Sequence, residues 1–129
     1  MSSDTEPAKP SPKLLVKVVG PCKSGKSTLV AGLRAAGFAA RSCGQEHSGA
    51  PAMWQRIHPP DVLVFLDVTV DTMRERVARS DWTDDMLAVQ QQRLAHARAH
   101  ADLLIATDEA SPQAVLQQVI TYLQTVAGE

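Results

Sequence analysis

The sequence contains no asparagine and only two cysteines in 129 residues. Without asparagine it cannot carry the Asn-Lys-x-Asp motif with which Ras-like GTPases read guanine. No Asp stands three residues before a Gly, so their Asp-x-x-Gly switch is absent as well. The cysteines form neither a CxxC pattern nor a pairing with histidine, which argues against a zinc site and against a disulfide scaffold.

Long apolar runs and an excess of one charge are also missing. No apolar run approaches the roughly 18 residues of a membrane span. The formal net charge of −1 gives no reason to expect a nucleic-acid or membrane partner. The composition, 44% hydrophobic and 21% charged, is that of an ordinary globular protein. We therefore expect a reduced, cytoplasmic protein with one domain.

The N-terminal residues 1–12 are rich in proline, serine and charged residues. Such a segment buries little apolar surface, so we expect a disordered tail over 1–12 and a single folded domain over 13–129. The tail lacks the apolar stretch of a signal peptide, and we expect that it is not one.

Short apolar runs alternate with helix-like segments along the rest of the chain. The expected strands are 14–19, 38–43, 61–67 and 102–106. The expected helices are 26–36, 69–79, 83–100 and a final helix that starts at Ser111-Pro112. Residues 44–60 are expected to be a loop with a helical turn near 53–57. The alternation predicts an α/β fold, with a short parallel sheet of about four strands and helices on both faces.

One motif is specific enough to indicate chemistry. Residues 20–27 read Gly-Pro-Cys-Lys-Ser-Gly-Lys-Ser and match G-x-x-x-x-G-K-[ST], the phosphate-binding loop, between an expected strand and an expected helix. Glycines let the backbone curl so that its N–H groups face phosphate oxygens. Lys26 is expected to reach the β and γ phosphates, and the Ser27 hydroxyl to ligate Mg²⁺. The expected nucleotide-binding residues are Gly20, Pro21, Cys22, Lys23, Ser24, Gly25, Lys26, Ser27 and Thr28.

Three segments together resemble the P-loop kinases, in particular short nucleoside and nucleotide kinases of the thymidylate-kinase kind. They are the loop above, the run 61–69 followed by arginines, and the run 101–108 followed by Ser111-Pro112. The resemblance implies a P-loop NTPase-type fold of three layers, with one strand fewer than such kinases and the strand order 2-1-3-4. It also implies ATP and Mg²⁺ as ligands, with the last strand–helix junction beside the adenine.

Glu46 follows the second expected strand, where open α/β sheets place their ligands. A carboxylate there can orient a Mg²⁺-bound water or accept a proton from an acceptor hydroxyl, and His47 is a candidate for the substrate site next to it. The alternative is a solvated loop acid. Asp67 ends an apolar strand, as a metal-binding Walker-B acid would, and a structural role is the alternative that stays open.

Arg74, Arg76 and Arg79 lie on or after one short expected helix. Phosphoryl transfer needs positive charge over the transferring group, and we take Arg74 and Arg79 as the catalytic candidates. The alternative is a charged helix face that is balanced by neighbouring acids.

Trp54 and Arg56 lie in the short expected loop 44–60 and are candidates for binding the acceptor. Trp54 is expected to stack on a base or sugar of the acceptor and Arg56 to bind its phosphate or carboxylate, unless Trp54 only closes the core. His96 and His100, four residues apart on a helix, are expected on a solvated face.

The sequence thus predicts a small kinase that transfers the γ-phosphoryl group of MgATP to a small, nucleoside- or nucleotide-like acceptor. The alternative is a nucleotide-binding or slow NTPase module that acts on a protein partner and needs no acceptor.

Overall fold

The computed structural model describes residues 14–21, 24–56, 59–77 and 84–127. Its centre is a sheet of four parallel strands in the order β3-β2-β4-β5. The strands are β2 (Leu15–Val19), β3 (Ala39–Ser42), β4 (Val62–Asp67) and β5 (Leu103–Ala106). The predicted α/β fold with this strand order is confirmed.

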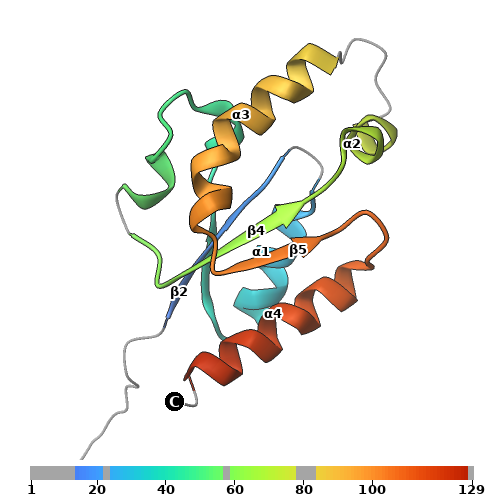
Figure 1. Ribbon diagram of the computed structural model, residues 1–129. Helices are drawn as coiled ribbons and strands as arrows, with labels where there is room; N and C mark the ends of the chain where they lie inside the picture. Colours follow the sequence, from blue (N-terminus) through green and yellow to red (C-terminus); the bar gives the residue numbers. More distant parts are fainter. Residues whose placement is uncertain (1–13, 22–23, 57–58, 78–83, 128–129) are drawn as a thin grey trace, which may run out of the picture.

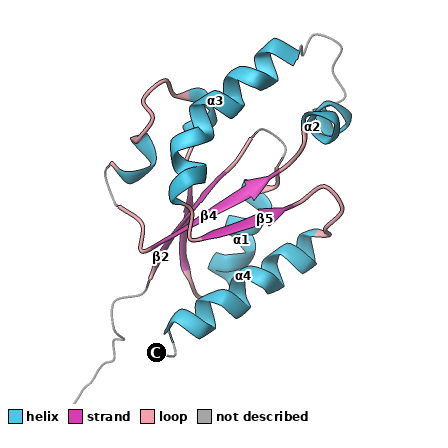
Figure 2. Cartoon of the chain, viewed as in Figure 1, coloured by secondary structure: helices cyan, strands magenta, loops and turns pink. Residues whose placement is uncertain are grey.

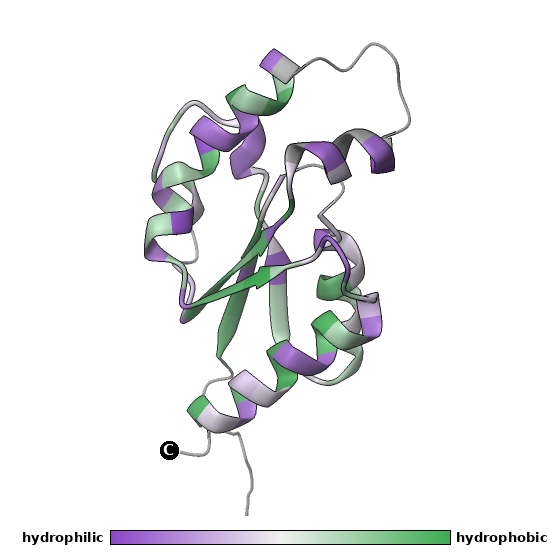
Figure 3. Cartoon of the chain, turned by 45° about the vertical axis from the view of Figure 1, so that its right-hand side comes forward, coloured by the Kyte–Doolittle hydropathy of each residue, from purple (hydrophilic) through white to green (hydrophobic). Residues whose placement is uncertain are grey.

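The two inner strands are buried on both faces and almost wholly apolar, with Lys17 of β2 as the exception, which is why they form the centre of a parallel sheet. In β4 the five residues from Val62 to Leu66 are all buried. Val16 of β2 pairs with Ala40 on one side and with Val62 on the other, so β2 lies between two parallel neighbours. Figure 3 shows the hydrophobic colouring concentrated in these central strands.

Helices cover both faces of the sheet (Figures 1 and 2). The helices α1 (Lys26–Ala35) and α4 (Pro112–Ala127) pack on one face, where Leu33, Leu123 and the side chains of Val16 and Val18 form a first core. The helix α3 (Asp84–His100) packs on the other face, where Leu94 joins Phe65 in a second core. The result is a three-layer molecule in which the sheet separates two cores.

Shorter elements connect these layers. The helix α2 (Val70–Val77) follows β4, and two single-turn helices, η1 (Gln45–His47) and η2 (Met53–Gln55), lie between β3 and β4. The turn η2 was predicted, whereas η1 falls in a segment that the sequence predicted as loop. None of the helices described is long and apolar enough to cross a membrane.

Element ends follow the predicted signals closely. Ser111 Oγ accepts a hydrogen bond from Ala114 N at 3.0 Å, and Thr69 Oγ1 accepts one from Thr72 N at 3.3 Å, so both residues cap the helices that follow them. Gly37 ends α1 with a φ of 96°. The predicted tail over residues 1–12 lies outside the described residues.

Candidate functional site

Loop 20–27 joins the end of β2 to the start of α1 at the carboxyl edge of the sheet. The ends of β3 and β4 meet the same edge, because the strands are parallel. Polar side chains that follow these three strands are thereby brought around one loop.

Two glycines shape this loop for different reasons. A Cβ at Gly20 would lie 2.5 Å from the main-chain oxygen of Leu66, so only glycine lets β2 end this close to β4. Gly25 adopts φ 99° and ψ 18°, in the left-handed region, and is the N-cap of α1. A Cβ at Gly25 would meet nothing within 4 Å, so the backbone conformation and not the available space requires glycine there.

Lys26 turns back over this loop. Its ammonium donates to the main-chain oxygens of Gly20 at 2.8 Å and Pro21 at 3.0 Å, and lies 2.8 Å from Glu46 Oε2. An ammonium has three protons, so the three oxygens engage all of them. The lysine predicted to bind phosphate is therefore held at the loop by one carboxylate and two carbonyl groups.

Glu46 reaches Lys26 from η1, at the end of β3. Its side chain is only 5% exposed, and its second oxygen, Oε1, is buried without a hydrogen-bond partner in the structure. Ser24 Oγ in the loop is likewise buried and unpartnered. Because burying a polar atom without a partner is costly, each of these two atoms would be stabilised by a hydrogen bond to a ligand or to water.

The start of α1 adds a positive potential at the same place. The first four amides of a helix have no partner within the helix, and the helix dipole places partial positive charge there. The first turn of α1 contains no acidic residue. Ser27 and Thr28, in this turn, are both exposed. Together with Lys26, this turn forms an anion-binding environment.

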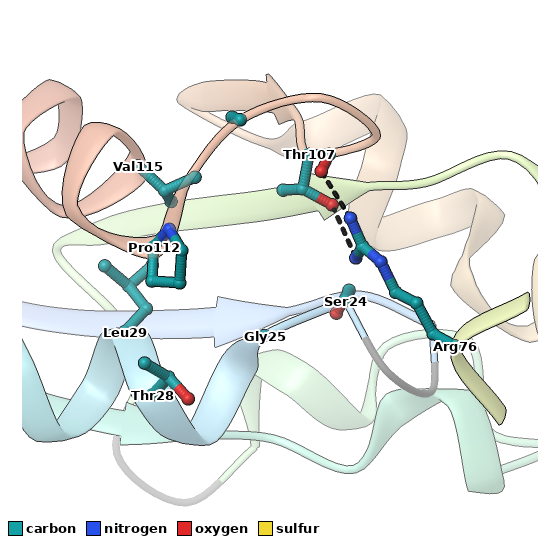
Figure 4. A pocket seen from close by; sticks show the side chains of 9 residues that line it. Ser24, Gly25, Thr28, Leu29, Arg76, Thr107, Pro112 and Val115 are labelled. Atoms are coloured by element: carbon teal, nitrogen blue, oxygen red, sulfur yellow. Dashed lines mark hydrogen bonds between the residues drawn. The ribbon is translucent and has the colours of Figure 1, made fainter. Parts of the chain in front are cut away.

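A cavity of about 270 Å³ opens beside the loop (Figure 4). Apolar side chains from α1 and from the start of α4 make one wall, and Arg76 of α2 and Thr107 make another. Its lining residues are Ser24, Gly25, Thr28, Leu29, Arg76, Thr107, Ala110, Pro112 and Val115. This is the last strand–helix junction, where the resemblance places an adenine.

Arg76 lines the cavity on the side of Thr107 (Figure 4) and is the arginine of α2 that the structure describes in full. Its guanidinium donates to the hydroxyl and to the main-chain oxygen of Thr107. Thr107 in turn donates from its N and its Oγ1 to the main-chain oxygen of Asp67, at 2.8 and 3.1 Å. Arg76 thereby links α2 to the ends of β4 and β5. Arg79 and the side chain of Arg74 lie outside the described residues, and their predicted catalytic roles stay predictions.

Asp67 also reaches the carboxyl edge of the sheet, but both of its carboxylate oxygens are engaged. Oδ2 lies 2.8 Å from a guanidinium nitrogen of Arg98 on α3, and Oδ1 accepts from Val68 N at 3.1 Å. The guanidinium of Arg98 stands 5.5 Å from the centre of the Phe65 ring. This arrangement favours the structural alternative for Asp67, which ties α3 to β4.

His47 and Cys43 flank Glu46. The His47 ring is largely exposed, and its Nε2 lies 3.6 Å from Glu46 Oε2. Burial raises the pKa of the Cys43 thiol above its ordinary value, and the positive charge of Lys17 opposes this only in part. The thiol is therefore protonated at neutral pH and a poor nucleophile.

The Trp54 side chain is 7% exposed and belongs to the second core, under α3. Its Nε1 donates to His96 Nδ1 at 3.0 Å, and the His96 ring stacks on His100 with centroids 4.2 Å apart. The solvated face predicted for the two histidines is thus partly covered by Trp54. Arg56 is exposed just after η2.

Two residues of the site were not predicted from the sequence. Thr107 gave no signal, because a threonine after a strand is common and only the fold brings it to Arg76. Gln45, fully buried beside Glu46, also gave none. Cys22 and Lys23, predicted to bind nucleotide, lie outside the described residues.

No model of a known protein family matches this sequence, and no curated protein matches it either. The function proposed below is therefore inferred from the site itself.

Proposed function

We propose that the chain binds a nucleoside triphosphate, preferentially MgATP, and transfers its γ-phosphoryl group to a small acceptor, as a short P-loop kinase. The observation that carries this proposal is the Lys26 ammonium in a glycine-shaped loop at a helix N-terminus. The cavity of about 270 Å³ beside the loop supports it, because that cavity can take a nucleoside whose phosphates lie on the loop.

The residues present fit a magnesium ion. Ser27 offers an exposed hydroxyl, a hard oxygen donor of the kind that Mg²⁺ takes alongside phosphate oxygens. Asp67 fits less well, since Arg98 and Val68 already engage its carboxylate. When bound, the ion neutralises charge on the β and γ phosphates.

The described side chains then have distinct tasks. Lys26 leaves the loop carbonyls and binds phosphate oxygens, where it stabilises charge on the transferring group. Glu46 accepts the proton of the acceptor hydroxyl as the new bond from that oxygen to the γ phosphorus forms. The bond from the γ phosphorus to the bridging oxygen breaks, and the nucleoside diphosphate leaves with that oxygen.

One observation favours a second function, a slow NTPase module that acts on a protein partner. Trp54 is engaged in the second core, so the aromatic side chain proposed to bind the acceptor is not available at Lys26. With water in place of an acceptor, Glu46 takes the proton of the water and inorganic phosphate is released.

Calorimetric titration with ATP and GTP, with and without Mg²⁺, tests the binding site. We expect Mg²⁺-dependent binding of ATP that Lys26→Ala weakens at least about a hundredfold, because the variant loses a charge-assisted contact to two phosphates. Arg34→Ala, at the other end of α1, is the matched control and should bind as the wild type does. Equal affinity of Lys26→Ala and the wild type contradicts the proposal.

Labelled γ-phosphate separates the two functions. Transfer of the label to added nucleosides or nucleotides supports the kinase. Release of the label only as inorganic phosphate, at the same rate whatever small acceptor is added, supports the NTPase module.

A further inference from the structure

The side chain of Gln45 lies fully buried one residue before Glu46. Its amide nitrogen donates to the main-chain oxygens of Ala50 at 2.7 Å and of Arg93 at 3.2 Å. Its amide oxygen accepts from Trp54 N at 2.9 Å. A glutamine amide has two protons, so both are used. Two of the partners, Ala50 and Trp54, follow in the same segment 44–60, and the third, Arg93, lies on α3.

These bonds continue to the strand that leads into loop 20–27. Lys17 of β2 is 6% exposed, and its ammonium donates to the main-chain oxygen of Trp54 at 2.8 Å. A line of buried polar contacts therefore runs from β2 through the main chain of Trp54 to Gln45, and from Gln45 to α3. Such contacts are strong and directional in the interior, where water does not compete for them.

Among the described residues, the backbone hydrogen bonds that tie the segment around Glu46 to the sheet end at Cys43, three residues before that glutamate. Pairing of β3 with β2 extends to Ser42, and Cys43 N donates to Val18 O at 3.0 Å. The bonds of η1, from His47 N to Gly44 O and from Ser48 N to Gln45 O, stay within the turn. Gln45 thus supplies the side-chain contacts that fix η1 against α3 just where Glu46 must reach Lys26.

We propose that Gln45 is a positioning residue, which sets the Glu46 carboxylate against the Lys26 ammonium and couples that pair to α3. Its catalytic consequence rests on the function proposed above. Gln45 is fully buried, and its three side-chain hydrogen bonds all go to main-chain atoms of the protein. A shift of Glu46 by about 1 Å is enough to impair proton transfer severely, since such chemistry depends on atomic placement.

Gln45→Met is the variant of choice, because methionine has nearly the same length and removes all three hydrogen bonds. In the protein without nucleotide, NMR follows the Lys26 Nζ and Glu46 carboxyl resonances, assigned with Lys26→Ala and Glu46→Gln. We expect both resonances to move in Gln45→Met toward their positions in the variants that break the pair. Resonances at wild-type positions in Gln45→Met overturn the proposal, whatever the protein binds.

Turnover of MgATP gives the second measurement. We expect Gln45→Met to lower kcat at least about tenfold and to change KM for ATP less than about threefold, because the phosphate-binding loop is intact. In a Glu46→Gln background the same substitution should lower kcat less than about twofold, since Gln45 acts through Glu46. Equal losses of kcat in both backgrounds overturn the coupling.

A matched control separates positioning from loss of stability. Val119→Ala, in the fully buried part of α4 on the other face of the sheet, weakens the fold without touching η1 and should keep the wild-type kcat. If both resonances move in Gln45→Met but the wild type neither binds nor turns over MgATP, the positioning of Glu46 stands and the proposed function is wrong.

Discussion

At the scale of single residues, the backbone conformation of Gly25 determines where the Lys26 side chain lies. Its φ of 99° turns the chain from the loop after β2 into α1. Lys26 therefore begins the helix, and its side chain folds back over the loop. Every residue with a Cβ is disfavoured in that left-handed region. The position of Lys26 therefore depends on a neighbour that has no side chain.

We expect Gly25→Ala to lower the free energy of unfolding by about 1–2 kcal/mol, the cost of the left-handed conformation for an alanine. Denaturant unfolding of the protein without ligand measures it. Gly49→Ala is the control, because Gly49 is exposed and outside the left-handed region, and a Cβ there meets nothing within 4 Å. Equal stability of the two variants would show that the Gly25 conformation is not strained for alanine.

At the scale of elements, the start of α2 is tied to the segment after β5 by one carboxylate. Asp108 Oδ1 accepts from Thr69 N and from Thr69 Oγ1, each at 2.9 Å. The hydrogen bond from the Thr69 amide, helped by those from the hydroxyl groups of Thr72 and Thr69, holds the pKa of the Asp108 carboxyl below its usual value. The ionised carboxylate thus favours the docked position of α2, the helix that carries Arg76.

The sign of the pH effect follows from this direction. A lowered pKa in the folded state means that Asp108 stabilises the fold at neutral pH and that this contribution is lost as the pH falls through the acid range. We expect Asp108→Asn to be less stable than the wild type at pH 7 and the difference to shrink by pH 3. Denaturant midpoints at the two pH values measure it. The exposed neighbour variant Glu109→Gln should keep the wild-type pH dependence, and a difference for Asp108→Asn that does not change with pH contradicts the assignment.

At the scale of the whole molecule, the sheet separates two cores that share no side chain. Ile105 belongs to the core under α1 and α4, and Leu94 to the core under α3. The candidate site draws on both sides: the cavity lies on the α1 and α4 side, and Gln45 anchors Glu46 to α3. The candidate site at the carboxyl edge is therefore built from both layers.

Because the two cores are separate, substitutions in them should act independently. We expect Leu94→Ala to cost about 2–5 kcal/mol and Ile105→Val about 0.5–1.5 kcal/mol of unfolding free energy. The double variant should show the sum within about 0.5 kcal/mol, as residues without shared partners do. Denaturant unfolding of the four proteins measures it, and a clearly larger coupling would mean that the sheet transmits packing changes between its faces.

Patterns of short range were enough to predict much of this fold. The apolar runs that became β2 and β4, the caps Ser111 and Thr69, and the terminating Gly37 act within a few residues of chain, so they can be read directly. In segment 44–60 only the turn η2 was predicted in this way, and η1 was not. The polar and small residues of this segment have no period, and η1 is held by Gln45 through partners that lie up to 48 residues away.

The sequence by itself determined the alternation of strands and helices and the phosphate-loop motif, because each depends on local pattern. The strand order was expected from the resemblance to P-loop kinases, and the sheet has that order. Only the tertiary structure decided which acid meets Lys26. Glu46 follows β3 and Asp67 ends β4, the two strands that flank β2. Arg98 of α3 pairs with Asp67, whereas Glu46 pairs with Lys26. Tertiary structure also decided between the two alternatives for Trp54, whose side chain lies in the second core. Burying a large indole against α3 lowers the free energy of the fold more than exposing it in a loop does. Pairings of this kind depend on which helix covers which face, and no local pattern encodes them.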